Sequence, residues 1–145
     1  MNNELVIQKK GSDLIYYCSY FQLIVCFFSL YYKIYKCSAI TIITFYTSTN
    51  YWRNPIQNSN RRIVDILCVI SGIAYHGYII KDYEFSNKYY KLIGIGSLLY
   101  PLGFCFNKQY IYIPAINHCL LQLLADIIAI NIYRNLYLEN TLKNM

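Results

Sequence analysis

Charged residues are scarce in this chain. Asp, Glu, Lys and Arg make up 14% of its 145 residues, whereas hydrophobic residues make up 57%. Soluble domains carry about 25% charged and about 45–50% apolar residues, so this composition excludes an ordinary soluble domain. Glycine and proline are also few, at 6 and 3 residues, which excludes a collagen-like or low-complexity chain. The composition points to the membrane, and the length suits a single membrane-embedded helical domain over residues 1–145.

Motifs for catalysis, metal binding and phosphate binding are also missing from the sequence. The 6 cysteines form no C-x-x-C pair, and 2 histidines cannot complete a zinc-finger pattern. No glycine-rich phosphate loop and no G-x-S-x-G nucleophile motif occurs. We interpret the cysteines as small buried hydrophobes and expect no cofactor and no metal. Basic residues are spread along the chain, so we expect no nucleic-acid partner.

Five long uncharged runs are what the sequence does contain. A membrane helix needs about 20 apolar residues, because about 30 Å of hydrocarbon is crossed at about 1.5 Å per residue. The runs are Leu14–Tyr32, Cys37–Trp52, Ile66–Ile80, Leu92–Asn107 and Gln109–Tyr133, the last interrupted at Asp126. We predict an all-α fold, an integral membrane bundle of four to five transmembrane helices, with the first run an uncleaved anchor.

Aromatic and glycine residues fit these spans. Tyrosines and the one tryptophan gather near the ends of the runs, where amphipathic rings favour the headgroup level. The residues are Tyr31, Tyr32, Tyr35, Tyr51, Trp52, Tyr75, Tyr78, Tyr83, Tyr89, Tyr90, Tyr110, Tyr112, Tyr133 and Tyr137. We interpret Gly94 and Gly96, with Pro101, as a place for close helix approach and a kink. The basic residues, six on one side against seven on the other, do not decide the orientation.

Polar groups inside the predicted spans are the candidate site residues, because each ionisable group there costs about 2.5–3.5 kcal/mol to insert. They form three stripes at helical spacing: Thr41, Thr44 and Ser48; Asp65 and His76; His118, Gln122 and Asp126. If the stripes converge, Ser48, Asp65, His118 and Asp126 are the candidate catalytic residues. The alternative is that these groups only form hydrogen bonds between helices, and each such bond stabilises the bundle by about 0.6 kcal/mol.

Three expectations about the acidic side chains follow from the spacing. Asp65 lies one turn after Arg61 and Arg62, which would stabilise it. Asp65 and His76 share a face but, about 16 Å apart, do not share a site. We expect Asp126 to face the bundle and to bond a polar group on another helix, with Thr41, Thr44 and Ser48 as the first candidates.

The segment from Ser48 to His76 resembles small multi-pass membrane proteins of giant DNA viruses of the mimivirus kind. The resemblance rests on Asn50-Tyr51-Trp52-Arg53-Asn54-Pro55, on Arg62-x-x-Asp65 and on Tyr75-His76. The many Ile, Tyr and Asn residues, which A/T-rich codons encode, agree with such a source. That family has no established activity to carry over.

The chain also resembles the CREST membrane hydrolases, the group of alkaline ceramidases and adiponectin-type receptors. Their pattern is S-x-x-x-H on one helix, an Asp early on the next and H-x-x-x-H on the last, with three histidines holding zinc. Ser48, Asp65 and His118 match this pattern, whereas Trp52 and Gln122 stand at two of the ligand positions. Because catalytic zinc needs three protein ligands, the resemblance implies a degenerate, inactive relative.

We therefore expect a non-enzymatic, multi-pass integral membrane protein that organises a membrane or binds a partner. Its partners would be the lipid bilayer, other membrane proteins or a second copy of the chain. A viral origin would place it in a host-cell or virion membrane. The alternative is a membrane-embedded hydrolase or a small transporter that uses Ser48, Asp65, His118 and Asp126.

Overall fold

The fold is helical throughout the part of the chain that the computed structural model describes, which is residues 5–105 and 112–143, without the side chains of residues 99–105. The elements are α1 (Lys9–Cys18), a 3-10 turn (Ser19–Phe21), α2 (Gln22–Tyr31), α3 (Tyr35–Trp52), α4 (Asn60–Ile80), α5 (Ser86–Cys105) and α6 (Ile113–Lys143). Besides these helices, the described residues form only an isolated bridge between Leu5 and Ile56. The predicted all-α fold is confirmed.

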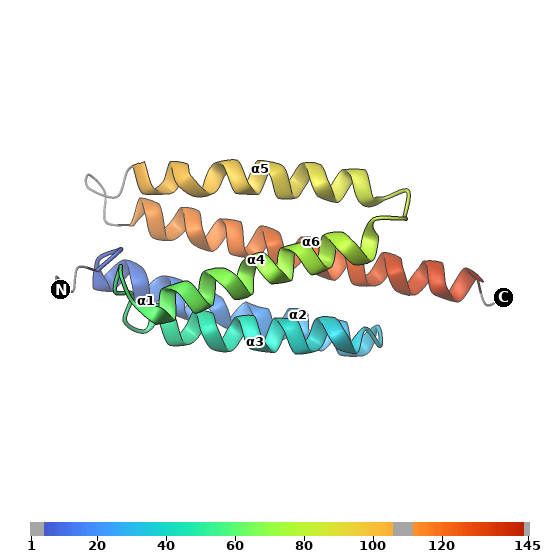
Figure 1. Cartoon of the computed structure of the whole chain (residues 1–145), viewed down its shortest axis with the longest axis horizontal. Coiled ribbons are helices and arrows are strands. Elements are labelled where there is room, and N and C mark those ends of the chain that lie inside the picture. The colour runs from blue at the N-terminus through green and yellow to red at the C-terminus, as the bar shows by residue number, and fades with distance from the viewer. Residues whose placement is uncertain (1–4, 106–111, 144–145) are drawn as a thin grey trace.

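The helices run up and down along one common axis (Figure 1). The first three helical segments make one long rod from Lys9 to Tyr31, which α3 follows back to the starting end. Helix α4 crosses α3 at an angle, and α5 and α6 form an antiparallel pair. Helix α6 packs against α1, α2, α4 and α5, so it is the common partner of the bundle.

Helix ends differ from the predicted runs because polar residues extend the helices beyond the apolar stretches. Helix α1 begins at Lys9, which pairs with Asp13 one turn later. Helix α4 begins at Asn60, where the Ser59 hydroxyl accepts the backbone N–H of Arg62 at 3.3 Å as an N-cap. Helix α6 continues ten residues past Tyr133, where the predicted run ended. The other predicted ends, Asn107 and Gln109, lie outside the described residues.

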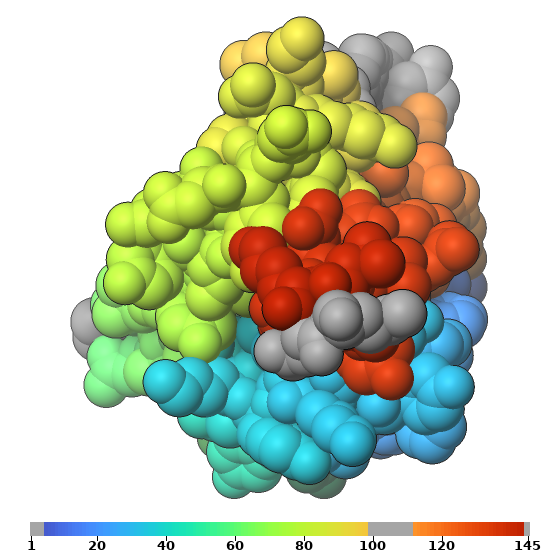
Figure 2. Space-filling model, turned by 90° about the vertical axis from the view of Figure 1, so that its right-hand side faces the viewer, coloured from blue at the N-terminus to red at the C-terminus, as the bar shows by residue number. Residues whose placement is uncertain are grey.

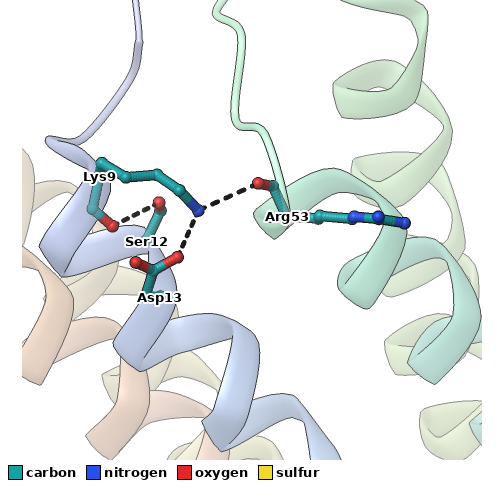
Figure 3. A network of polar contacts seen from close by, with 4 residues as sticks. All are labelled: Lys9, Ser12, Asp13 and Arg53. Atoms are coloured by element: carbon teal, nitrogen blue, oxygen red, sulfur yellow. Dashed lines mark hydrogen bonds and ion pairs between the residues drawn. The ribbon is translucent and has the colours of Figure 1, made fainter.

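The N-terminal segment is fastened to the loop between α3 and α4. The backbone N–H of Val6 donates to the carbonyl of Pro55 at 3.0 Å. The ammonium of Lys9 pairs with Asp13 and donates to the carbonyl of Arg53 at 3.3 Å, while the guanidinium of Arg53 points away from this network (Figure 3). The start of α1 and the end of α3 therefore lie at the same end of the bundle.

Two hydrophobic clusters close the bundle at its two ends. The cluster at the N-terminal end contains Ile7, Ile15, Tyr51, Trp52, Ala115 and Cys119. The cluster at the other end contains Val25, Cys37, Ile80, Tyr89, Ile128, Ile132, Tyr133 and Leu136. Figure 2 looks at this second end, where the tip of α6 lies between the α4–α5 connection and the α2–α3 connection. Tyr51, Trp52, Tyr89 and Tyr133, four of the aromatic residues predicted at the ends of the spans, are buried in these clusters.

Several polar residues point inward, and many large apolar residues point outward. Buried polar side chains include Ser12, Ser19, Gln22, Ser29, Ser38, Thr41, Ser48 and Asp65. On α4 the buried residues are Asp65, Gly72 and Ile80, whereas Leu67 and Ile70 are 58% and 56% exposed. Among the described residues, three helical segments are long and apolar enough to cross a membrane: Lys9–Tyr31, Asn60–Ile80 and Ile113–Lys143.

The helices approach one another more closely at Gly72 and Gly77 than at the glycines predicted for that role. A Cβ added at Gly72 would meet Ile40 Cγ2 at 3.4 Å, and one at Gly77 would meet Tyr90 Cε1 at 3.4 Å, both at ordinary van der Waals distance. A Cβ at Gly94 would meet nothing within 4 Å, and one at Gly96 would meet Leu121 Cδ2 at 3.9 Å. The predicted close approach at Gly94 and Gly96 is therefore wrong, and the side chain of Pro101 lies outside the described residues.

Candidate functional site

Ser48 and Asp65 form a short, buried polar contact between two helices. The Ser48 hydroxyl on α3 donates to Asp65 Oδ1 on α4 at 2.6 Å, and the Thr47 hydroxyl donates to the same oxygen at 3.2 Å. Both Ser48 and Asp65 are buried. The placement follows from the helical period, because Ser48 lies on the inner face of α3 and Asp65 is the first buried residue of α4.

The structure does not have the predicted interaction of Asp65 with Arg61 and Arg62. No ion pair joins Asp65 to either arginine in the described part of the chain. Arg62 instead donates from Nη1 to the carbonyl of Gln57 at 3.0 Å, which holds the α3–α4 loop. Asp65 turns inward because two hydroxyls of α3 offer it hydrogen bonds there, and Arg61 stays exposed.

His118 lies against Trp52, one turn beyond Ser48 on α3. The centroids of the two rings are 4.7 Å apart and their planes are inclined by 59°. Trp52 also contacts Tyr51, and both rings belong to the cluster at the N-terminal end. The structure therefore brings His118 to the helix that carries Ser48, but an indole, which cannot bind a metal, occupies the adjoining position.

The middle of the bundle contains buried polar atoms without hydrogen-bond partners. Within the described residues, these include Gln22 Oε1, Gln122 Nε2 and Asp126 Oδ2. The expected bond from Asp126 to the α3 stripe is not formed, because Thr41 and Thr44 donate to Cys37 and Ile40 of their own helix at 2.9 and 3.0 Å.

His76 makes a second polar link, which the sequence did not predict. Its Nδ1 lies 2.7 Å from the Gly72 carbonyl, and its Nε2 lies 2.7 Å from the Tyr133 hydroxyl on α6. A carbonyl only accepts, so Nδ1 carries a proton, and the neutral ring accepts the Tyr133 hydroxyl proton at Nε2. Asp65 and His76 thus meet different partners on different helices. Inner-face spacing was the one sequence signal for His76, because Tyr133 is 57 positions away.

The chemistry available to the four candidate residues is limited by these contacts. Ser48 and Asp65 are together, His118 is packed against Trp52, and Asp126 is bonded to none of the other three within the described residues. No group of three His, Cys, Asp or Glu side chains in this part of the chain is arranged to hold a metal ion. What the arrangement does supply is polar contacts that fix α3 to α4 and α4 to α6.

Comparisons with known proteins add no relative. No family model matches the chain, and neither the curated proteins nor the solved structures contain a significant match.

Proposed function

We propose that the chain is a multi-pass integral membrane protein in which five segments cross the bilayer. The support is the distribution of polarity: several serine side chains are buried inside the bundle together with Thr41 and Asp65, whereas many isoleucine and leucine side chains face outward. Such an outer surface costs free energy in water and none in lipid. The three segments with sufficient length and hydropathy supply the first, third and fifth crossings.

Helices α3 and α5 supply the second and fourth crossings in this proposal. With 18 and 20 residues, they extend about 27 and 30 Å, close to the thickness of the hydrocarbon layer. The contacts of Val6 and Lys9 with the α3–α4 loop support a return crossing by α3, because the loop lies beside the start of α1.

We infer further that the protein is non-enzymatic and acts by binding a membrane partner or by organising the membrane. The observation that carries this is the use of the inner polar groups: Asp65 is bonded to Thr47 and Ser48, and His76 to Tyr133, which are contacts between helices. The outward apolar face of α4 is left for lipid or for another membrane protein. With a viral source, the membrane would be that of the virion or the host cell.

Membrane fractionation tests the first part of the proposal. After expression without detergent, the chain should stay in the membrane pellet through a carbonate wash at high pH, which releases peripheral proteins. A soluble cytosolic protein expressed in the same cells is the control for complete washing. Recovery of the chain in the soluble fraction would contradict the proposal.

A membrane-embedded hydrolase is the second candidate function, and the Ser48–Asp65 contact favours it. A carboxylate 2.6 Å from a serine hydroxyl can accept the proton of a nucleophile. The test is hydrolysis of a long-chain amide by detergent-purified protein, with metal analysis of the same sample. Turnover that Ser48→Ala abolishes and Thr49→Ala keeps would establish this function, and absence of turnover in the wild type would exclude it for that substrate.

A further inference from the structure

A groove runs along the outer surface between α3 and α4. Its volume is about 220 Å³, and its lining residues are Ile40, Ile43, Thr44, Leu67, Cys68, Ser71 and Gly72. Gly72 contributes no side chain to the lining, and a Cβ there would stand 3.4 Å from Ile40 Cγ2. Ile43 and Leu67 are 54% and 58% exposed, so the groove opens away from the bundle.

If α4 spans the membrane, the groove lies at the depth of the acyl chains of one leaflet. Cys68 and Gly72 follow Arg61 by seven and eleven residues, which is about 10 and 16 Å along the axis of α4. One leaflet of the hydrocarbon layer is about 15 Å thick. With Arg61 at the headgroup level, the groove therefore extends to the depth at which an acyl chain of the same leaflet ends.

Arg61 stands above the groove on the same stripe of α4. The residues Arg61, Cys68 and Gly72 are at positions i, i+7 and i+11, which place them on one face of the helix. Arg61 is exposed, and no described acidic side chain pairs with it. Three of the four arginines in the chain, at positions 53, 61 and 62, are at this end of α3 and α4. Arginine suits the phosphate oxygens of a lipid because its guanidinium can donate two parallel hydrogen bonds.

From this alignment, we infer that the α3–α4 groove is a binding site for an anionic phospholipid, with its phosphate at Arg61 and one acyl chain along Cys68, Ser71 and Gly72. The inference rests on the proposed membrane embedding. The complementary charge of Arg61 selects the headgroup, and the apolar lining accepts the chain. A second copy of the protein would fill the groove with a helix instead and would leave Arg61 without a phosphate.

Native mass spectrometry of the detergent-purified full chain tests the inference, with phosphatidylglycerol and phosphatidylcholine of equal acyl chains as probes. Arg61→Gln should weaken phosphatidylglycerol binding about fivefold, as expected for about 1 kcal/mol per basic residue near an anionic surface, and weaken binding of the zwitterionic phosphatidylcholine less. Ser71→Phe should fill the groove and lower the retention of both lipids. Matched controls are Arg134→Gln, an exposed cation on α6, and Ile127→Phe, an outward apolar residue of α6.

The possible outcomes separate this inference from the proposed function. A carbonate-resistant chain that binds both lipids equally, or that loses no lipid in Arg61→Gln and Ser71→Phe, contradicts the lipid site and leaves the membrane proposal intact. A dimer that Ser71→Phe dissociates assigns the groove to a second copy and also overturns the inference. If Ser71→Phe fails to insert into the membrane, the test is the preference for phosphatidylglycerol over phosphatidylcholine in the two arginine variants. A preference lost in Arg61→Gln and kept in Arg134→Gln supports the site, and a preference kept in both contradicts it.

Discussion

At the scale of single residues, the hydroxyl of Ser48 joins α3 to α4 through its hydrogen bond to Asp65. It donates to a buried carboxylate that has one other described hydroxyl donor, Thr47. Ser48→Ala should lower the free energy of unfolding by about 1–2 kcal/mol, since it leaves Asp65 partly unsatisfied. Thermal melts in detergent measure the loss. The control is Thr49→Ala, whose hydroxyl donates only to its own helix; an equal loss in both variants would contradict the assignment.

The His76–Tyr133 contact predicts which ring nitrogen of His76 carries the proton. Because the Gly72 carbonyl accepts from Nδ1, His76 should be the neutral tautomer with its proton on Nδ1. Nitrogen-15 NMR of the labelled ring distinguishes the tautomers, and a proton found on Nε2 alone would be inconsistent with the structure. Tyr133→Phe should cost about 0.6–1.7 kcal/mol of stability, whereas Tyr78→Phe, at an exposed ring, should cost nothing measurable.

Asp126 is predicted to be dispensable as a charge. Its Oδ2 is buried without a hydrogen-bond partner among the described residues, so an ionised carboxylate there loses its hydration and gains no described bond. Asp126→Asn should therefore melt at the same temperature as the wild type or higher. Glu139→Gln near the C-terminal end is the control for a general charge effect. A clear fall in melting temperature for Asp126→Asn alone would mean that the carboxylate holds a bound cation or proton.

At the scale of the element, a substitution on the outer face of α4 can show whether this helix lies in a membrane or in a water-soluble bundle. Ile70, in the middle of α4, is 56% exposed. Lysine at such a position is nearly neutral in water but raises the free energy of membrane insertion by about 3 kcal/mol. Ile70→Lys should therefore reduce insertion of α4 in a translocon assay, and Ile70→Leu should not. Unchanged insertion of the lysine variant would place this face in water.

How far the sequence could predict the elements depends on what determines each one. The uncharged runs located the helices, because the length and hydrophobicity of a span are properties of consecutive residues. Polar caps such as Ser59 and the Lys9–Asp13 pair then moved the ends. Partners between helices, such as Tyr133 for His76, depend on how each helix is rotated against its neighbour, which no local pattern contains. Asp126 was predicted to bond Thr41, Thr44 or Ser48. Thr41 and Thr44 instead donate to their own i−4 carbonyls, as threonine in helices often does, and Ser48 donates to Asp65.

At the scale of the whole molecule, the number of crossings determines on which side each loop lies. With five crossings, residue 33 is on one side of the membrane, residue 57 on the other, and residue 82 on the first again. With only Lys9–Tyr31, Asn60–Ile80 and Ile113–Lys143 crossing, residues 33 and 57 share a side and residue 82 is opposite. The three positions are exposed in the structure, so each can carry a reporter.

Labelling of Lys33→Cys, Gln57→Cys and Asp82→Cys with a membrane-impermeant thiol reagent in sealed vesicles distinguishes these topologies. We expect residues 33 and 82 to react together and residue 57 to react only after the vesicles are opened, or the reverse in vesicles of opposite orientation. The wild-type chain is the background control, because its described cysteines lie inside helices. Equal reactivity of residues 33 and 57 would contradict a crossing by α3. It would also require the contacts of Val6 and Lys9 with the α3–α4 loop to break, because these contacts hold the start of α1 at the end where α3 finishes.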